Sequence, residues 1–193
     1  MTPDYLILVQ ELRDAGVPVD DVWDLVNTRV QYPAAVPILL DWLSHRVPVE
    51  DIRMREGLVR ALTIRAARPA AFPVLVHEFR TTEDDIYRWV VGNALSVVAD
   101  ASAYDELVAI ILDRRYGWGR ERLVEALWRF KKNPRTVPIL LDLLNDPEAT
   151  AWAVRALSRI KPAGIKARMA VLLDHPDPEV RKRAEKALPT LPD

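Results

Sequence analysis

The chain has 193 residues, of which 50% are hydrophobic and 28% are charged, and its formal net charge is -1. A chain of this length can bury a core large enough to fold without disulfides, and with no cysteine it forms none. The small net charge argues against a surface built mainly to hold nucleic acid, and no stretch is long and apolar enough to cross a bilayer. The missing cysteines and the lack of a basic, apolar leader favour a cytoplasmic protein without a membrane partner.

Charge is distributed unevenly along the chain. Residues 1–100 hold 10 Arg and no Lys against 15 acidic residues, a net charge of -5, whereas residues 101–193 hold 17 basic and 13 acidic residues, a net charge of +4. The acidic residues concentrate near Asp20 to Asp24 and the basic residues near Arg181 to Lys186. Such a gradient can steer a charged partner, although ordinary solvated helix surfaces also account for it.

The first 31 residues contain two amphipathic segments, Asp4–Ala15 and Val19–Val30. Their spacing predicts a helix pair. This pair lacks the Ala-Leu signature that marks the rest of the chain, and its second segment is acidic. We therefore expect residues 1–31 to form a capping pair at the N-terminus of a repeat array.

An Ala-Leu pair recurs through the remainder of the chain at intervals of 33, 32, 30 and 31 residues. A period near 32 residues is typical of a solenoid. Each Ala-Leu segment follows another apolar segment, and both show apolar residues at spacings of three and four, which predicts two helices per repeat. The alanines are Ala61, Ala94, Ala126, Ala156 and Ala187, and the predicted helix pairs span 33–66, 69–99, 103–132, 135–161 and 164–191.

The last repeat, DHPDPEVRKRAEKAL at Asp174–Leu188, resembles the HEAT repeat family, in particular the short units also found in phycobilisome lyases. The resemblance implies an all-α fold, a right-handed α-solenoid of about five HEAT-like helix pairs plus the N-terminal capping pair, as one domain over 1–193. It also implies a structural ladder of arginines six residues before each repeat alanine, from which Thr150 departs. The ladder residues are Arg55, Arg88, Arg120 and Arg181.

A second stripe of residues predicts a binding surface on the second helices, which are expected to line the concave inner wall of the solenoid. Trp89 and Trp128 fall on this stripe, and a solvated stripe needs no tryptophan. Together with Asn93, Glu125 and Arg155 they predict a partner-binding site, with the two indoles on adjacent helices about 10 Å apart. The alternative is that both indoles pack in the core.

No catalytic constellation emerges from the sequence. The three histidines fall in different repeats without the i, i+4 pairing of a zinc helix, and the only close glycine pair is Gly117 and Gly119. The sequence therefore predicts no metal site, no cofactor and no catalytic residue.

These observations favour a non-catalytic protein-interaction scaffold or adaptor that binds another protein on its concave face. A HEAT-like nucleic-acid-binding protein, or an enzyme similar to the alkylpurine DNA glycosylases, is the alternative. The residues that could form its cleft are Trp89, Glu125, Trp128, Arg155 and Arg159. The similarity to lyase repeats also suggests a helper for a tetrapyrrole group, without a site signature of its own.

Overall fold

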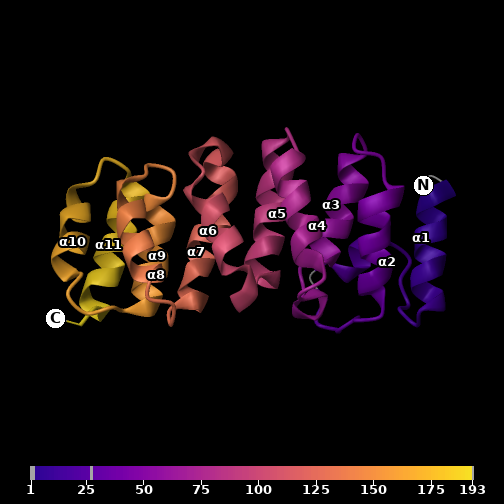
Figure 1. The fold of residues 1–193 in the computed structure, drawn as a ribbon, viewed down its shortest axis with the longest axis horizontal. Helices are drawn as coiled ribbons and strands as arrows, with labels where there is room; N and C mark the ends of the chain where they lie inside the picture. Colours follow the sequence, from indigo (N-terminus) through magenta and orange to yellow (C-terminus); the bar gives the residue numbers. More distant parts are fainter. Residues whose placement is uncertain (1–2, 27, 193) are drawn as a thin grey trace. The chain divides into compact units, whose positions relative to one another are not determined.

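The structure is a computed structural model that describes residues 3–26 and 28–192. Of the described residues, 73% are helical and none lies in a β-strand, so the predicted all-α fold is confirmed. The helices form two compact units, Met1–Ala103 and Tyr104–Asp193, and each unit is described here by itself (Figure 1).

The first unit begins with a single helix and continues with two helix pairs. The helices are α1, Pro3–Asp14; α2, Ala35–Asp41, paired with α3, Ile52–Ala61; and α4, Ala71–Thr81, paired with α5, Asp85–Val98. Asp51 and Asp84 cap the second helices, since their carboxylates accept hydrogen bonds from the N–H groups of Met54 and Tyr87 at 3.0 and 2.8 Å. The two second helices, α3 and α5, pack against each other.

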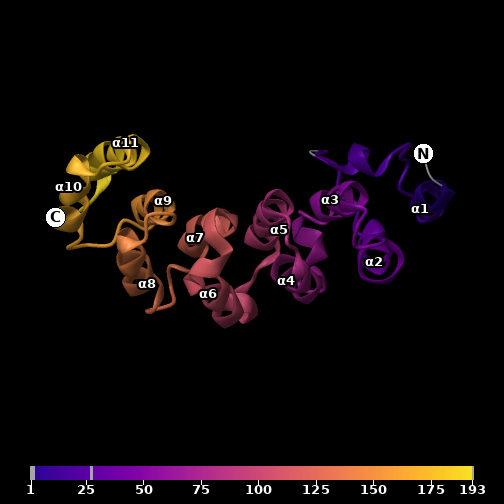
Figure 2. The ribbon, with the colours of Figure 1, turned by 90° about the horizontal axis from the view of Figure 1, so that it is seen from above.

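The second unit consists of three helix pairs in two layers (Figure 2). In each pair the first helix lies in one layer, and the second helices α7, α9 and α11 are successive neighbours in the other. The pairs are α6, Tyr104–Leu112, with α7, Glu121–Ala126; α8, Thr136–Asp142, with α9, Thr150–Ile160; and α10, Lys166–Val171, with α11, Pro178–Ala187. A 3-10 turn, Leu127–Phe130, extends α7.

The Ala-Leu pairs lie where the helices meet. Ala94, Leu95, Ala156 and Leu157 have no exposed surface, whereas Leu188, in the last repeat, is half-buried. Alanine allows the close approach of neighbouring helices and leucine fills the space between them. The repeat period therefore predicts the core correctly, and burial decreases at the last described repeat, which packs against a neighbouring described repeat on one side only.

The N-terminal segment differs from the expected helix pair. Within the described part of 19–30, the only helical segment is a single 3-10 turn, Val22–Leu25. Asp21 accepts a hydrogen bond from the N–H of Trp23, Asp24 accepts one from the N–H of Asp21, and the chain is already extended at Val26. Aspartate and valine are weak helix formers, so the capping bonds start a turn that the following residues do not continue.

The turn lies close against α3, the second helix of the next repeat, at a glycine whose missing side chain leaves room for it. A Cβ at Gly57 of α3 would come within 3.0 Å of the Val22 side chain and 3.3 Å of the Trp23 indole. Trp23 is half-buried in this contact, whereas Trp42 is a core residue with 2% exposure.

The ladder arginines donate hydrogen bonds to carbonyl groups that precede their own helix. Arg55 reaches Val47 O at 2.7 Å, Arg120 reaches Ile111 O at 2.9 Å and Arg181 reaches His175 O at 2.7 Å. Arg88 donates to Phe79 O and Thr82 O. The hydroxyl of Thr150, which replaces arginine, donates to Asp146 O at 2.6 Å. The arginines thus donate to carbonyls at or just after the end of the preceding helical segment, whereas the Asp146 carbonyl also accepts the N–H groups of Ala149 and Thr150.

Two of the arginines also bridge to the following repeat. The buried Arg55 forms a bidentate pair with Glu78 of α4, and Glu78 accepts a further bond from the hydroxyl of Tyr87 at 2.8 Å. Arg120, 1% exposed, donates to Asp146 at 2.9 Å. Burial alone would raise the pKa of Asp146, but the hydrogen bond and positive charge of Arg120 outweigh it and lower the pKa. Asp146 is therefore held as a carboxylate between two repeats.

The burial pattern predicts that truncation of a leucine costs more in the middle of the second unit than at its end. Leu157→Ala should lower the free energy of unfolding by about 2 to 5 kcal/mol, because it leaves a cavity in a closed core. Leu188→Ala, at a half-buried position, should cost less. Urea unfolding followed by circular dichroism measures both values, and equal costs would contradict the stacked arrangement.

The Arg120–Asp146 pair predicts acid sensitivity. Because the folded protein lowers the pKa of Asp146, the pair stabilises the fold above the unfolded-state value near 3.8, and this stability is lost as the pH falls through the lower folded value. Asp146→Asn should cost about 1 to 3 kcal/mol at pH 7, and its unfolding free energy should depend less on pH below about 4. Asp142→Asn, at an exposed position of α8, is the control, and an equal change in both variants would argue against the pair.

Candidate functional site

The structure divides the five predicted binding residues between the two units. Glu125 lies on α7, Trp128 in the 3-10 turn that extends it, and Arg155 on α9, all in the second unit. Trp89 and Asn93 lie on α5 of the first unit. The proximity of Trp89 to Trp128 stays a prediction, whereas the three residues of the second unit belong to one group of contacts.

A buried carboxylate is at the centre of that group. Glu125 is 6% exposed and accepts hydrogen bonds or ion pairs from three guanidinium groups. Its Oε1 lies 2.8 Å from Nε of Arg155 and 3.2 Å from Nη1 of Arg159, and its Oε2 lies 3.1 Å from Nη1 of Arg122. Since Arg122 is on α7 and the other two are on α9, the carboxylate ties the two helices together and orients three cations around one anion.

Two indoles lie beside these cations. The guanidinium carbon of Arg159 is 4.7 Å from the ring centre of Trp128. Three guanidinium groups surround the ring of Trp152, at 4.5 Å for Arg183 of α11, 5.7 Å for Arg122 and 5.9 Å for Arg155. These distances lie within the range of cation–π attraction. We call the whole group the cation–aromatic cluster; it consists of Arg122, Glu125, Trp128, Trp152, Arg155, Arg159 and Arg183.

The indoles of the cluster are neither fully exposed nor buried in the core. Trp128 and Trp152 are half-buried, as is Trp89 in the first unit, whereas Trp118 in the turn after α6 is 40% exposed. None of the three half-buried indoles is a core residue of the kind that Trp42 is. The guanidinium groups cover part of the indole surface in the second unit and leave the cluster accessible from the side of the second helices, where the Arg155 and Arg159 side chains are each 46% exposed.

Four members of the cluster were absent from the predicted site: Arg122, Trp152, Arg159 and Arg183. A signal for three of them exists in the sequence, because Arg122, Trp152 and Arg183 all stand four residues before their repeat alanine. Residues at equivalent positions of successive repeats become neighbours when the repeats stack. Comparison of equivalent positions across repeats, instead of along one helix, places the indole between two arginines.

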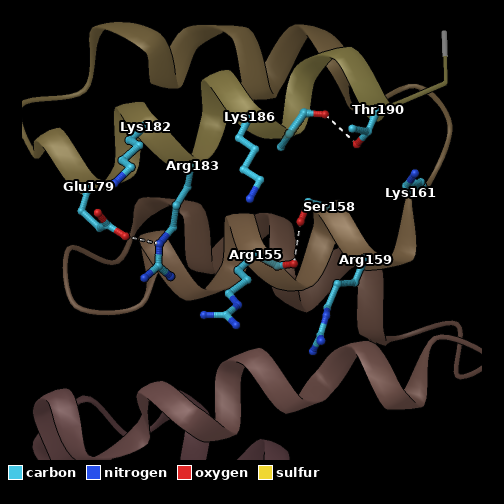
Figure 3. Close-up of a pocket in the computed structure, with 10 residues that line it drawn as sticks. Arg155, Ser158, Arg159, Lys161, Glu179, Lys182, Arg183, Lys186 and Thr190 are labelled. Carbon is cyan, nitrogen blue, oxygen red and sulfur yellow. Dashed lines mark hydrogen bonds and ion pairs between the residues drawn. The ribbon is translucent and has the colours of Figure 1, made fainter.

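A groove opens between α9 and α11 beside the cluster (Figure 3). Its volume is about 500 Å³, and six of its lining side chains are basic while one, Glu179, is acidic. Glu179 bonds to Arg183 at 2.8 Å, and in Figure 3 Lys186 extends from α11 toward α9. The basic side chains are Arg155, Arg159, Lys161, Lys182, Arg183 and Lys186.

The predicted residues of the first unit have a different setting. Asn93 lines a small cavity of about 160 Å³ together with Tyr32 and Arg60. The hydroxyl of Tyr32 lies within hydrogen-bond distance of two carbonyl oxygens, Leu25 O at 3.0 Å and Ala61 O at 2.8 Å, and its one proton is shared between them. This buried tyrosine therefore joins the N-terminal turn to α3. Arg60, which pairs with Glu56 at 2.7 Å, is the one basic residue among those lining this cavity, compared with six in the groove between α9 and α11.

Within residues 3–26 and 28–192, no three histidine, aspartate or glutamate side chains come together in a way that could hold a metal ion. Likewise, none of the helices in the described part of the chain has both the length and the apolar character needed to cross a membrane.

The paired helices, the buried Ala-Leu positions and the two-layered second unit define an α-solenoid of stacked helix pairs. Residues 104–189, which make up nearly all of the second unit, match the family model of HEAT repeats. The resemblance to HEAT repeats seen in the last repeat is thus confirmed over residues 104–189. Comparisons with curated proteins and with solved structures gave no match.

Proposed function

We propose that this protein is a non-catalytic HEAT-repeat scaffold or adaptor that binds another protein on its second-helix face, meaning the solvent-facing sides of α7, α9 and α11 in the second unit and of α3 and α5 in the first. HEAT repeats generally act as protein-interaction scaffolds. Within the second unit, Glu125, Trp128 and Arg155 are the residues on which the proposal rests, and Trp89 and Asn93 extend it to the first unit.

The observation that carries the proposal is the cation–aromatic cluster. Tryptophan and arginine contribute a large share of binding energy at protein interfaces, and their value depends on being held in place before the partner arrives. Glu125 provides that order, because its carboxylate fixes guanidinium groups that would otherwise sample many rotamers. A solvated helix surface has no need of two indoles, three clamped arginines and a buried acid.

A nucleic-acid-binding or glycosylase-like function is the second candidate, favoured by the basic groove and its neighbouring indoles. In such an enzyme Glu125 would serve as the reacting carboxylate. Its two oxygens, however, contact Arg122, Arg155 and Arg159. This arrangement supports a role in positioning the arginines.

A cytoplasmic location belongs to the proposal as well, supported by the absence of cysteine from the sequence.

Capture of the partner from an extract of the native host tests the proposal. Trp128→Ser and Arg155→Ala should each reduce the amount of captured protein several-fold, because each removes a contact surface of the cluster. Two changes in the same unit serve as matched controls: Trp118→Ser, at an exposed indole, and Arg135→Ala, at an exposed arginine that pairs with Asp105 at 2.7 Å. Both controls should retain capture.

Thermal melts accompany the capture, since Trp128 is half-buried and its loss is expected to lower the melting temperature by a few degrees. Trp89→Ser reports whether the first unit contributes to the same interaction. Capture that is unaffected by either cluster variant would overturn the proposed surface. Capture of a complex that nuclease treatment abolishes would instead favour the nucleic-acid function.

A further inference from the structure

One row of equivalent positions crosses the second unit from helix to helix. The residue directly before the repeat alanine is Glu125 on α7, Arg155 on α9 and Lys186 on α11. Between α7 and α9 the row places an acidic residue beside a basic one: Oε1 of Glu125 lies 2.8 Å from Nε of Arg155. The charges of neighbouring repeats are therefore matched between α7 and α9.

Between α9 and α11 the row places two positively charged residues next to each other. Arg155 and Lys186 line the same groove between α9 and α11, and both are cations. Glu179 is the one acidic side chain lining this groove, and it is paired with Arg183. In the part of the chain that the structure describes, no ion pair involves the exposed Lys161, Lys182 or Lys186, and only Lys182 lies near an acid, Glu179, which already pairs with Arg183. The groove therefore carries more positive than negative charge.

We propose that this groove binds an acidic peptide segment of the partner protein, whose carboxylates occupy, between α9 and α11, the place that Glu125 occupies between α7 and α9. The inference rests on the proposed function and specifies the chemistry of the partner. Arg155 and Arg159 supply guanidinium N–H groups from one wall, while Lys182 and Lys186 supply ammonium groups from the other. Since the Arg155 and Arg159 side chains are each 46% exposed, their remaining N–H groups are accessible.

The spacing of the cations suits an extended peptide. Arg155 and Arg159 are four residues apart on α9, and Lys182 and Lys186 are four residues apart on α11, which corresponds to about 6 Å along each helix. An extended chain advances about 3.3 Å per residue, so alternate side chains are separated by about 6.6 Å. A segment with aspartate or glutamate at every second position thus brings one carboxylate to each pair of facing cations. The groove volume of about 500 Å³ accommodates several such side chains.

Peptide carboxylates fit the groove better than the phosphates of a nucleic acid. Proteins that hold single strands add base stacking on open aromatic faces to their phosphate contacts. Trp128 and Trp152 do not line the groove, and guanidinium groups already lie over their rings. The net charge of the second unit is also only +4. Few phosphate contacts and little stacking would support only weak binding of a nucleic acid.

Fluorescence anisotropy with the full chain tests the inference. The probes are a labelled peptide of about ten residues in which glutamate and serine alternate, the same peptide with glutamine for glutamate, and a thymidine single strand of about the same length. The glutamate peptide should bind, and its affinity should fall as NaCl rises from about 50 to about 200 mM. The glutamine peptide should bind at least about 10-fold more weakly, and the single strand should bind more weakly than the glutamate peptide.

A pair of double variants locates the binding. The double variant Lys182→Ala with Lys186→Ala should bind the glutamate peptide about 10-fold more weakly, because it removes two cations from one wall of the groove. Lys131→Ala with Lys132→Ala removes the same charge from exposed positions outside the groove and should change the affinity by less than about twofold. Circular dichroism confirms that both variants are folded.

Equal effects of the two double variants, absence of binding by the glutamate peptide, or tighter binding of the single strand would each overturn the inference. The proposed function fails separately. If a host partner is captured through Trp128 and Arg155 while the acidic peptide does not bind, the proposed scaffold function stands. Only the inference that the partner presents an acidic segment is then rejected.

Discussion

A two-helix repeat cannot cover its own apolar face, and this constraint governs the whole structure. Each pair buries its Ala-Leu positions only when a second helix of a neighbouring repeat lies against it, as α9 lies between α7 and α11. Stacking then brings residues about 30 positions apart in the sequence into contact. Surface residues at equivalent repeat positions meet for the same reason as core residues do. The polar contacts of the second-helix face are thus a consequence of how the core is packed.

This arrangement connects packing to recognition through the charges of successive repeats. Where opposite charges meet, as at Glu125 and Arg155, the contact is satisfied within the chain and orders the neighbouring side chains. Where like charges meet, as at Arg155 and Lys186, the groove carries an excess of positive charge that a ligand can neutralise. The same row of positions therefore forms a structural contact between α7 and α9 and a candidate binding site between α9 and α11. Unpaired cations of this kind cost little stability because they remain solvated.

The sequence predicts some levels of this structure better than others, for physical reasons. The Ala-Leu period identifies the helix pairs because burial imposes the same residues in every repeat. The turn at Val22–Leu25 is mispredicted as a helix, since its apolar spacing resembles that of a helix while local aspartate bonds limit it to one turn. The sequence leaves open whether Trp128 is exposed or packed in the core, and in the structure it is half-buried beside the guanidinium group of Arg159. Trp152 was missed because its partners, Arg122 and Arg183, come from the repeats on either side. Contacts between repeats become visible in the sequence only when equivalent positions are compared.

Arg155 of α9 and Lys186 of α11 hold equivalent repeat positions and line the same groove, with no acid in the row between them. A double-mutant cycle of Lys186→Glu with Arg155→Ala, with the free energy of unfolding as the measured quantity, tests whether the two positions interact. The charge reversal at Lys186 should be more favourable by about 0.5 to 1 kcal/mol when Arg155 is present than when it is replaced by alanine, because the new carboxylate then pairs with the guanidinium group. A coupling energy of zero would show that the two positions do not interact across the groove, and equivalent positions would then not explain the charge of the groove.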